Sequence, residues 1–354
     1  MNERREFLGA VARTGMGLVL ASGTARVAGG RDAATTSTRP LVKPPRLRPG
    51  DTVGLINPAS ANFLQEEVDI VVESLAALEL KVKRGAHMMD RYGYLAGRDR
   101  DRAADVNTMF ADPEVKAVLA VRGGWGCARI LPHLDYDLIR RNPKILLGYS
   151  DVTALHLAVH ARTGLVTFHG PVGVSSWTPF SVDHARRVLF DGEALTLANP
   201  VEEGDTLART EHRTRTIAPG RARGPLLGGN LTVLCNVLGS PYVPAWEGAV
   251  FFVEDVDEEI YRVDRMLTQL ALAGVLGQVR GFVFGTCTEC GPGSGYGSLT
   301  LEEVLADHVL PLKVPAWSGA VIGHVDKQFT LPVGLPVEID AEAATIRMLE
   351  PAVV

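Results

Sequence analysis

The 354-residue chain has little of several features, and each shortage excludes a class of protein. Its four cysteines are too few for the disulfide framework of a small secreted scaffold. It contains no run of about 18 apolar residues, so the sequence predicts no transmembrane helix. Basic residues are not in excess, and the net charge of −5 disfavours a general nucleic-acid binder. The sequence also shows no internal repeat of fixed period.

What remains is an ordinary globular composition, with 46% hydrophobic and 22% charged residues. These proportions exclude a disordered chain, a collagen and a coiled coil. The length favours about two domains.

The first 40 residues differ from the rest of the chain. Arg4 and Arg5 precede a weakly apolar stretch at 14–25, a pattern typical of a twin-arginine export signal. Glu3 before the pair and Arg13 within the early apolar region depart from that pattern. Because the segment that follows has no periodicity, we interpret residues 1–40 as signal and linker. They predict an exported protein of the periplasm or cell envelope, and the alternative is an amphipathic N-terminal helix.

Apolar strand-like runs alternate with helical spacing twice along the remaining chain, which predicts an α/β fold. We expect two domains, a parallel-sheet α/β domain followed by a mixed α/β domain. In the first, the expected strands lie near 53–56, 81–84, 115–121 and 145–147, and in the second near 249–253, 281–285 and 318–322. The expected organisation is an N-terminal domain at 41–190, a crossing segment at 191–223 and a C-terminal domain at 224–354.

Three reactive residues each follow an apolar run: Ser150, Glu254 and His324. Ligands of open α/β sheets bind beyond the carboxyl ends of the strands. The sequence therefore offers a nucleophile, an orienting carboxylate and a base at the expected location, although strands often end in polar residues by chance.

The run Gly148-Tyr149-Ser150-Asp151 is expected to join a strand to a helix, which would place a backbone N–H beside the Ser150 hydroxyl. The full G-x-S-x-G elbow is absent because Val152 stands at the second glycine position. The alternative is that Ser150 or Asp151 only caps the helix.

Other candidate motifs are incomplete. The glycines of Arg122-Gly123-Gly124-Trp125-Gly126 lack the G-x-G-x-x-G spacing of a dinucleotide site. His156 and His160 have the i, i+4 spacing of a zinc motif without its glutamate. Cys287 and Cys290 form a lone C-x-x-C without a second pair, which leaves a loop disulfide as an alternative to a metal site. Cys127 and Cys235 are expected to be buried or inert, and we expect no metal or organic cofactor.

Taken together in chain order, several motifs make the sequence similar to the LD-carboxypeptidases, also called muramoyltetrapeptide carboxypeptidases. The resemblance covers about residues 45–350 and rests on the following runs: Arg122-Gly123-Gly124-Trp125-Gly126, Gly148-Tyr149-Ser150-Asp151, His169-Gly170-Pro171, Glu254-Asp255-Val256, Tyr261 to Leu267, and Gly323-His324. Trp125 and Asp257 depart from the residues usual at those positions.

The resemblance implies a serine peptidase that removes the terminal D-alanine from the L,D bond of murein tetrapeptides. It assigns Ser150 as nucleophile, Glu254 as acid and His324 as base. We further expect backbone N–H groups of Gly124 and Asp151 in an oxyanion hole, and Arg122 at the substrate carboxylate. The expected assembly is a homodimer.

Two rival functions remain open at this stage. The first is a peptidase that inactivates peptidyl-nucleotide antibiotics of the microcin type, in which Trp177 would stack on a nucleobase. The second is a non-catalytic binding protein for wall peptides.

Overall fold

The computed structural model describes residues 39–354 except 203, 205–206 and 294–296. The predicted export signal lies outside the described residues. No helix in the described ranges is long and apolar enough to cross a membrane.

The first sheet has six strands in the order β12-β5-β4-β3-β1-β2. Five of them run parallel, as the alternating strand and helix pattern predicts, and β12 is antiparallel to β5. The strands are β1 (Thr52–Ile56), β2 (Lys81–Arg84), β3 (Val115–Ala120), β4 (Ile145–Gly148), β5 (Thr167–His169) and β12 (Leu331–Val333). The helices of this part are α1 (Gln65–Ala77), α2 (Asp99–Ala111), α3 (Cys127–Ile130), α4 (Tyr136–Arg141), α5 (Thr153–Thr163) and α6 (Pro179–Arg186).

The second sheet has eight strands in the order β6-β14-β13-β8-β9-β10-β11-β7. Its centre, β8 to β11, is parallel, and its flanks are antiparallel. The strands are β6 (Thr196–Ala198), β7 (Arg215–Ala218), β8 (Arg221–Asn230), β9 (Val250–Val256), β10 (Gly281–Thr288), β11 (Ala316–Ala320), β13 (Pro336–Asp340) and β14 (Thr345–Met348). The helices are α7 (Leu231–Val237), α8 (Ile260–Leu272) and α9 (Leu301–Val309).

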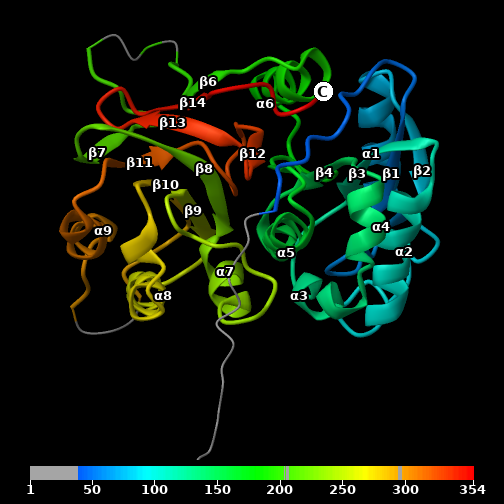
Figure 1. Cartoon of the computed structure of the whole chain (residues 1–354), viewed down its shortest axis with the longest axis horizontal. Helices are drawn as coiled ribbons and strands as arrows, with labels where there is room; N and C mark the ends of the chain where they lie inside the picture. Colours follow the sequence, from blue (N-terminus) through cyan, green and yellow to red (C-terminus); the bar gives the residue numbers. More distant parts are fainter. Residues whose placement is uncertain (1–38, 203, 205–206, 294–296) are drawn as a thin grey trace, which may run out of the picture. The chain divides into compact units, whose positions relative to one another are not determined.

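The two sheets are visible as separate groups of strands in Figure 1, with α5 and α7 between them. A hydrogen bond joins the two groups, because the backbone N–H of Asn230 at the end of β8 donates to Thr153 Oγ1 at 2.9 Å. The central strands of both sheets are almost wholly buried, which explains why their sequences are mainly apolar. This contact brings the start of α5 against the end of β8.

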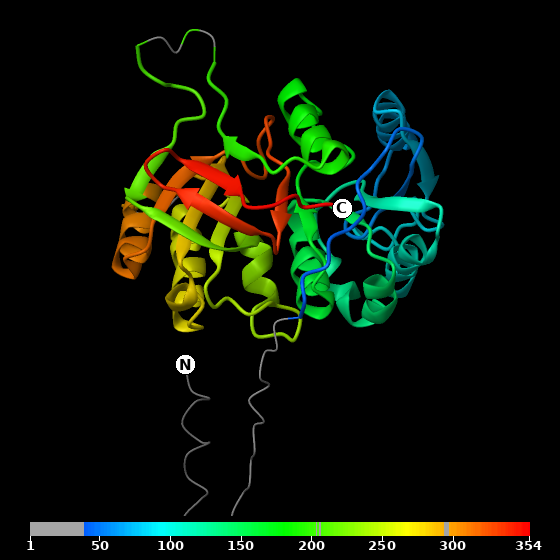
Figure 2. The ribbon, with the colours of Figure 1, turned by 45° about the horizontal axis from the view of Figure 1, so that its top comes forward.

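The chain crosses between the sheets more than once. Residues 191–223, which we expected as a crossing segment, contribute β6 and β7 to opposite edges of the second sheet. Late in the chain, β12 returns to the first sheet, as the red and orange segments in Figure 2 show. The segment that carries His324 therefore runs from β11 in one sheet to β12 in the other.

Candidate active site

Ser150 lies two residues beyond β4, at the first position of a short helical turn (Ser150–Val152) that leads into α5. Its φ of 63° is in the left-handed region that non-glycine residues seldom adopt. Gly123 packs directly against it, since a Cβ added to Gly123 would lie 2.9 Å from the Ser150 Cβ. The backbone at Ser150 is therefore strained. Because Gly123 has no side chain, it leaves room beside the Ser150 hydroxyl, which can bond to His324.

Glu254 lies within β9 rather than after it, because the strand continues to Val256. The sequence predicted the end of the strand at residue 253, since polar residues follow an apolar run there. The Glu254 side chain is fully buried, and its Oε2 accepts a hydrogen bond from His324 Nδ1 at 2.8 Å. Its other oxygen has no hydrogen-bond partner among the described residues.

His324 lies in the loop after β11, four residues past the end of that strand. Its Nδ1 donates to Glu254, which leaves Nε2 to accept from the Ser150 hydroxyl at 3.1 Å. Burial lowers the pKa of His324, but the hydrogen bond and negative charge of Glu254 outweigh it, so the pKa stands above its ordinary value. The ring also packs edge-on against Tyr149, with 4.9 Å between ring centroids.

Gly323 makes room for this arrangement. It has a φ of 80°, and a Cβ there would collide with the Glu254 carboxylate. Only glycine therefore lets the chain pass the buried carboxylate immediately before His324. The sequence indicated Gly323 only as part of the Gly323-His324 motif, because this steric role depends on the distant Glu254.

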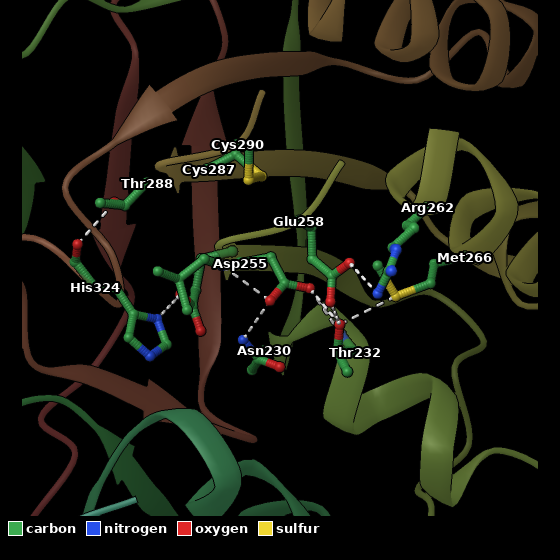
Figure 3. The surroundings of a disulfide bond; sticks show 12 residues. Asn230, Thr232, Asp255, Glu258, Arg262, Met266, Cys287, Thr288, Cys290 and His324 are labelled. Carbon is green, nitrogen blue, oxygen red and sulfur yellow. Dashed lines mark hydrogen bonds and ion pairs between the residues drawn. A yellow bond between two sulfur atoms is a disulfide. The ribbon is translucent and has the colours of Figure 1, made fainter. Parts of the chain in front are cut away.

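Asp255, next to Glu254, anchors the end of β9 to the start of α7. Its carboxylate accepts from Asn230 Nδ2 at 2.9 Å and from the backbone and hydroxyl of Thr232 at 2.9 and 2.8 Å (Figure 3). Burial raises the pKa of Asp255, although these donors oppose the shift. The network fixes the strand that carries Glu254.

The two residues expected in the oxyanion hole, Asp151 and Gly124, have different neighbours in the structure. The backbone nitrogen of Asp151 lies 3.5 Å from the point where a Gly123 Cβ would be, so both are adjacent to Ser150. Gly124 instead packs against Ser60, whose hydroxyl accepts from Trp125 N at 3.1 Å. Gly123 is therefore the glycine of this loop nearest to the serine. The Asp151 carboxylate accepts from Cys127 N at 2.7 Å and so holds the start of α3.

Arg122 and Trp177, the two residues predicted to contact a substrate, have different surroundings. Arg122 follows β3, and its Nη1 makes only a 3.5 Å contact with the Ala61 carbonyl. Its guanidinium forms no ion pair within the described ranges, and its buried Nε has no partner there. Trp177 is partly buried against the core, and its indole N–H donates to the Gly173 carbonyl at 3.2 Å.

The histidine and cysteine motifs have structural roles here. His156 Nε2 bonds the Gly148 carbonyl at 2.8 Å, and burial lowers its pKa to about 4. Cys287 and Cys290 form a disulfide, the alternative that the sequence left open. Among the described residues, the one group with metal-ligand spacing is His87, Asp90 and Asp101, which shares no residue with the Ser150 site.

A serine hydroxyl bonded to a histidine that is held by a buried carboxylate is the arrangement of serine-type hydrolases. Comparison with known proteins shows to which family of hydrolases the chain belongs. Family models described as the LD-carboxypeptidase N-terminal domain and C-terminal domain match residues 53–170 and 223–339. The chain belongs to the LD-carboxypeptidase family and is a serine-type peptidase.

Individual relatives agree with this family. The chain is 40% identical over 308 residues to a Bacillus subtilis (strain 168) protein named "Probable murein peptide carboxypeptidase", covering 86% of this chain and 93% of that one. It is 31% identical to the "Murein tetrapeptide carboxypeptidase" of Pseudomonas aeruginosa, covering 80% and 91%. The solved wild-type apo structure of the microcin C7 self-immunity protein MccF matches with a TM-score of 0.80 at 26% identity, covering 88% and 100%.

Proposed function

We propose that this protein is a carboxypeptidase that cleaves the L,D bond to the terminal D-alanine of murein tetrapeptides. The observation that carries the proposal is the continuous hydrogen-bonded path from Ser150 through His324 to the buried Glu254. The family and its murein-cleaving relatives support the choice of substrate.

In the proposed reaction, Ser150 attacks the scissile carbonyl while His324 Nε2 takes the hydroxyl proton. Glu254 keeps the other ring nitrogen protonated and stabilises the imidazolium that forms. The leaving D-alanine takes the proton from His324, and water then releases the acyl group by the same steps. Backbone N–H groups of Asp151 and of the Gly123–Gly124 loop would stabilise the oxyanion.

An exopeptidase must also recognise the terminal carboxylate. Arg122 is the candidate for this role, because it lies two residues past β3 and its buried Nε has no hydrogen-bond partner in the described part of the chain. A substrate carboxylate would supply that partner by a charge-assisted pair of hydrogen bonds.

The test is hydrolysis of purified murein peptides by the wild type and Ser150→Ala. We expect tetrapeptide to be trimmed to tripeptide, pentapeptide with its D,D terminal bond to stay intact, and the variant to be inactive. Release of alanine from pentapeptide would contradict the proposed specificity.

The likeness to MccF supports a second candidate, a peptidase that inactivates peptidyl-nucleotide antibiotics. The same assay distinguishes the two when a peptidyl nucleotide is included as a further substrate, because this candidate predicts cleavage of the peptidyl nucleotide and no cleavage of the tetrapeptide.

We also propose that the protein is exported through its N-terminal arginine pair. The Cys287–Cys290 disulfide supports this, since disulfides persist mainly in oxidising compartments outside the cytosol.

A further inference from the structure

The end of β10 contacts the loop that carries His324. Thr288 is the last residue of β10, and its hydroxyl donates to the backbone carbonyl of His324 at 2.7 Å (Figure 3). The Cys287–Cys290 disulfide encloses Thr288 within a four-residue ring. The mechanism proposed above uses neither the threonine nor the disulfide.

The His324 loop needs such a contact because it has left the sheet. Pairing between β10 and β11 ends at Gly285 and Ala320, four residues before His324. Beyond that point, two threonine hydroxyls of β10 make hydrogen bonds to backbone carbonyls at the end of the β10–β11 pairing and in the loop that follows it. Thr286 Oγ1 bonds the Ala320 carbonyl at 3.3 Å, and Thr288 Oγ1 bonds the carbonyl of His324 itself.

Thr288 is in turn fixed from two sides. Its carbonyl accepts from Asp257 N at 2.9 Å, just past the strand that carries Glu254. On its other side, the disulfide closes a turn in which Glu289 has a φ of 57°. A cross-link between residues three apart restricts the backbone of the residues that it encloses.

We propose that Thr288 is a positioning residue for His324 and that the Cys287–Cys290 disulfide holds Thr288 in that role. This inference rests on the proposed function, in which His324 is the base. Glu254 and Ser150 orient the imidazole ring, whereas Thr288 fixes the main chain from which the ring extends. Reducing the disulfide would release this anchor without touching a group of the triad.

The first test compares Thr288→Val, which keeps the shape but loses the hydroxyl, with Thr288→Ser, which keeps the hydroxyl. We expect Thr288→Val to lower kcat by on the order of 10²-fold with little change in KM, the scale of a misplaced reacting group. Thr288→Ser should retain most of kcat. Thr268→Val, at an exposed threonine of α8, is the matched control and should change neither constant.

The pH profile distinguishes positioning from general loss of structure. His324 is influenced by Glu254 and Asp255 on β9 and lies near the buried His169 of β5 and the Tyr149 ring. A loosened His324 loses part of its bond to Glu254, so the acid limb of kcat should move to lower pH in Thr288→Val. A variant with normal kcat, or with lower kcat and an unmoved limb, would overturn the role of Thr288.

The second test breaks the disulfide. Dithiothreitol supplies two electrons and two protons, so the S–S bond becomes two thiols and the reagent becomes its cyclic disulfide. We expect reduction to lower the wild-type kcat to that of Cys287→Ser/Cys290→Ser, and the double variant to be insensitive to the reagent. Alkylation and mass spectrometry of a parallel sample show whether both thiols are free. If they are free and kcat is unchanged, the proposed role of the disulfide is overturned.

A substrate-independent readout separates this inference from the choice of substrate. A fluorophosphonate probe labels a serine that its histidine activates, whatever the peptide specificity. If tetrapeptide is not cleaved but Ser150 is labelled, and labelling slows in Thr288→Val, the inference stands while the substrate proposal fails. If the wild type is not labelled at Ser150, both the triad and the positioning role are overturned.

Discussion

Substitutions of the three site residues, Ser150, His324 and Glu254, should reduce turnover by different amounts. In the proposed mechanism, Ser150→Ala removes the attacking atom and His324→Ala removes its base, so each should lower turnover by about 10⁴–10⁶-fold. Glu254→Ala should cost less, since Glu254 orients the imidazole and transfers no proton. Turnover of a murein tetrapeptide measures this, with circular dichroism to confirm folding.

The double variant Ser150→Ala/His324→Ala is the control for cooperation. Groups that act in one step are not additive, so it should be little worse than either single variant. A folded Ser150→Ala protein that retains more than about a tenth of wild-type turnover would rule Ser150 out as nucleophile, because that corresponds to only ~1.4 kcal/mol.

The raised pKa of His324 predicts how activity depends on pH. A base must be neutral to accept the serine proton, so kcat should fall as the pH drops through this raised pKa. Glu254→Gln removes the negative charge and leaves the burial, which lowers the pKa. The acid limb of kcat should therefore move to lower pH in Glu254→Gln, and an upward shift would contradict the pairing.

At the scale of elements, the buried central strands could be predicted because each contains an apolar run. The apolar runs at β3, β4 and β9 gave expected ranges close to those found. The short strands β6, β7 and β12 could not, because each has only three or four residues and is defined by its partner. Pairing partners distant in sequence leave no local signal.

The site shows the same division. The order of Ser150, Glu254 and His324 at or near strand ends could be predicted, since the carboxyl ends of parallel strands converge. The contacts of Gly323 with Glu254 and of Thr288 with the His324 carbonyl could not, because they depend on how two loops pack. The sequence also predicted the backbone N–H of Gly124 in an oxyanion hole, whereas the glycine that packs against the Ser150 side chain is Gly123.

Gly323 allows a prediction at this scale. Gly323→Ala places a methyl group against the Glu254 carboxylate in a backbone conformation that costs about 1–3 kcal/mol for a non-glycine residue. We expect a lower Tm and a loss of tetrapeptide turnover on the order of 10²-fold as His324 is displaced. Gly277→Ala, where an added Cβ meets nothing within 4 Å, is the matched control and should keep both. Equal behaviour of the two variants would refute the steric role.

For the whole molecule, the N-terminal signal and the disulfide make one joint prediction. The proposal that an export receptor reads the arginine pair predicts that Arg4→Lys/Arg5→Lys retains the protein in the cytosol. Cytosolic thiols are kept reduced, so the retained protein should carry free Cys287 and Cys290, whereas the wild type, if it is exported as proposed, should carry the disulfide. Cell fractionation followed by thiol alkylation and mass spectrometry measures location and redox state in one sample.

Arg13→Lys is the matched control for that experiment, because it makes the same chemical change outside the arginine pair. It should leave both export and the disulfide unchanged. If the paired variant is exported as well as the wild type, the N-terminus is not a twin-arginine signal. If the paired variant stays in the cytosol with its disulfide formed, export is not what oxidises Cys287 and Cys290, and the disulfide loses its value as support for the location. Retention together with free thiols and a lowered kcat would connect the compartment to the Thr288 contact, since the protein would then reach full turnover only after export.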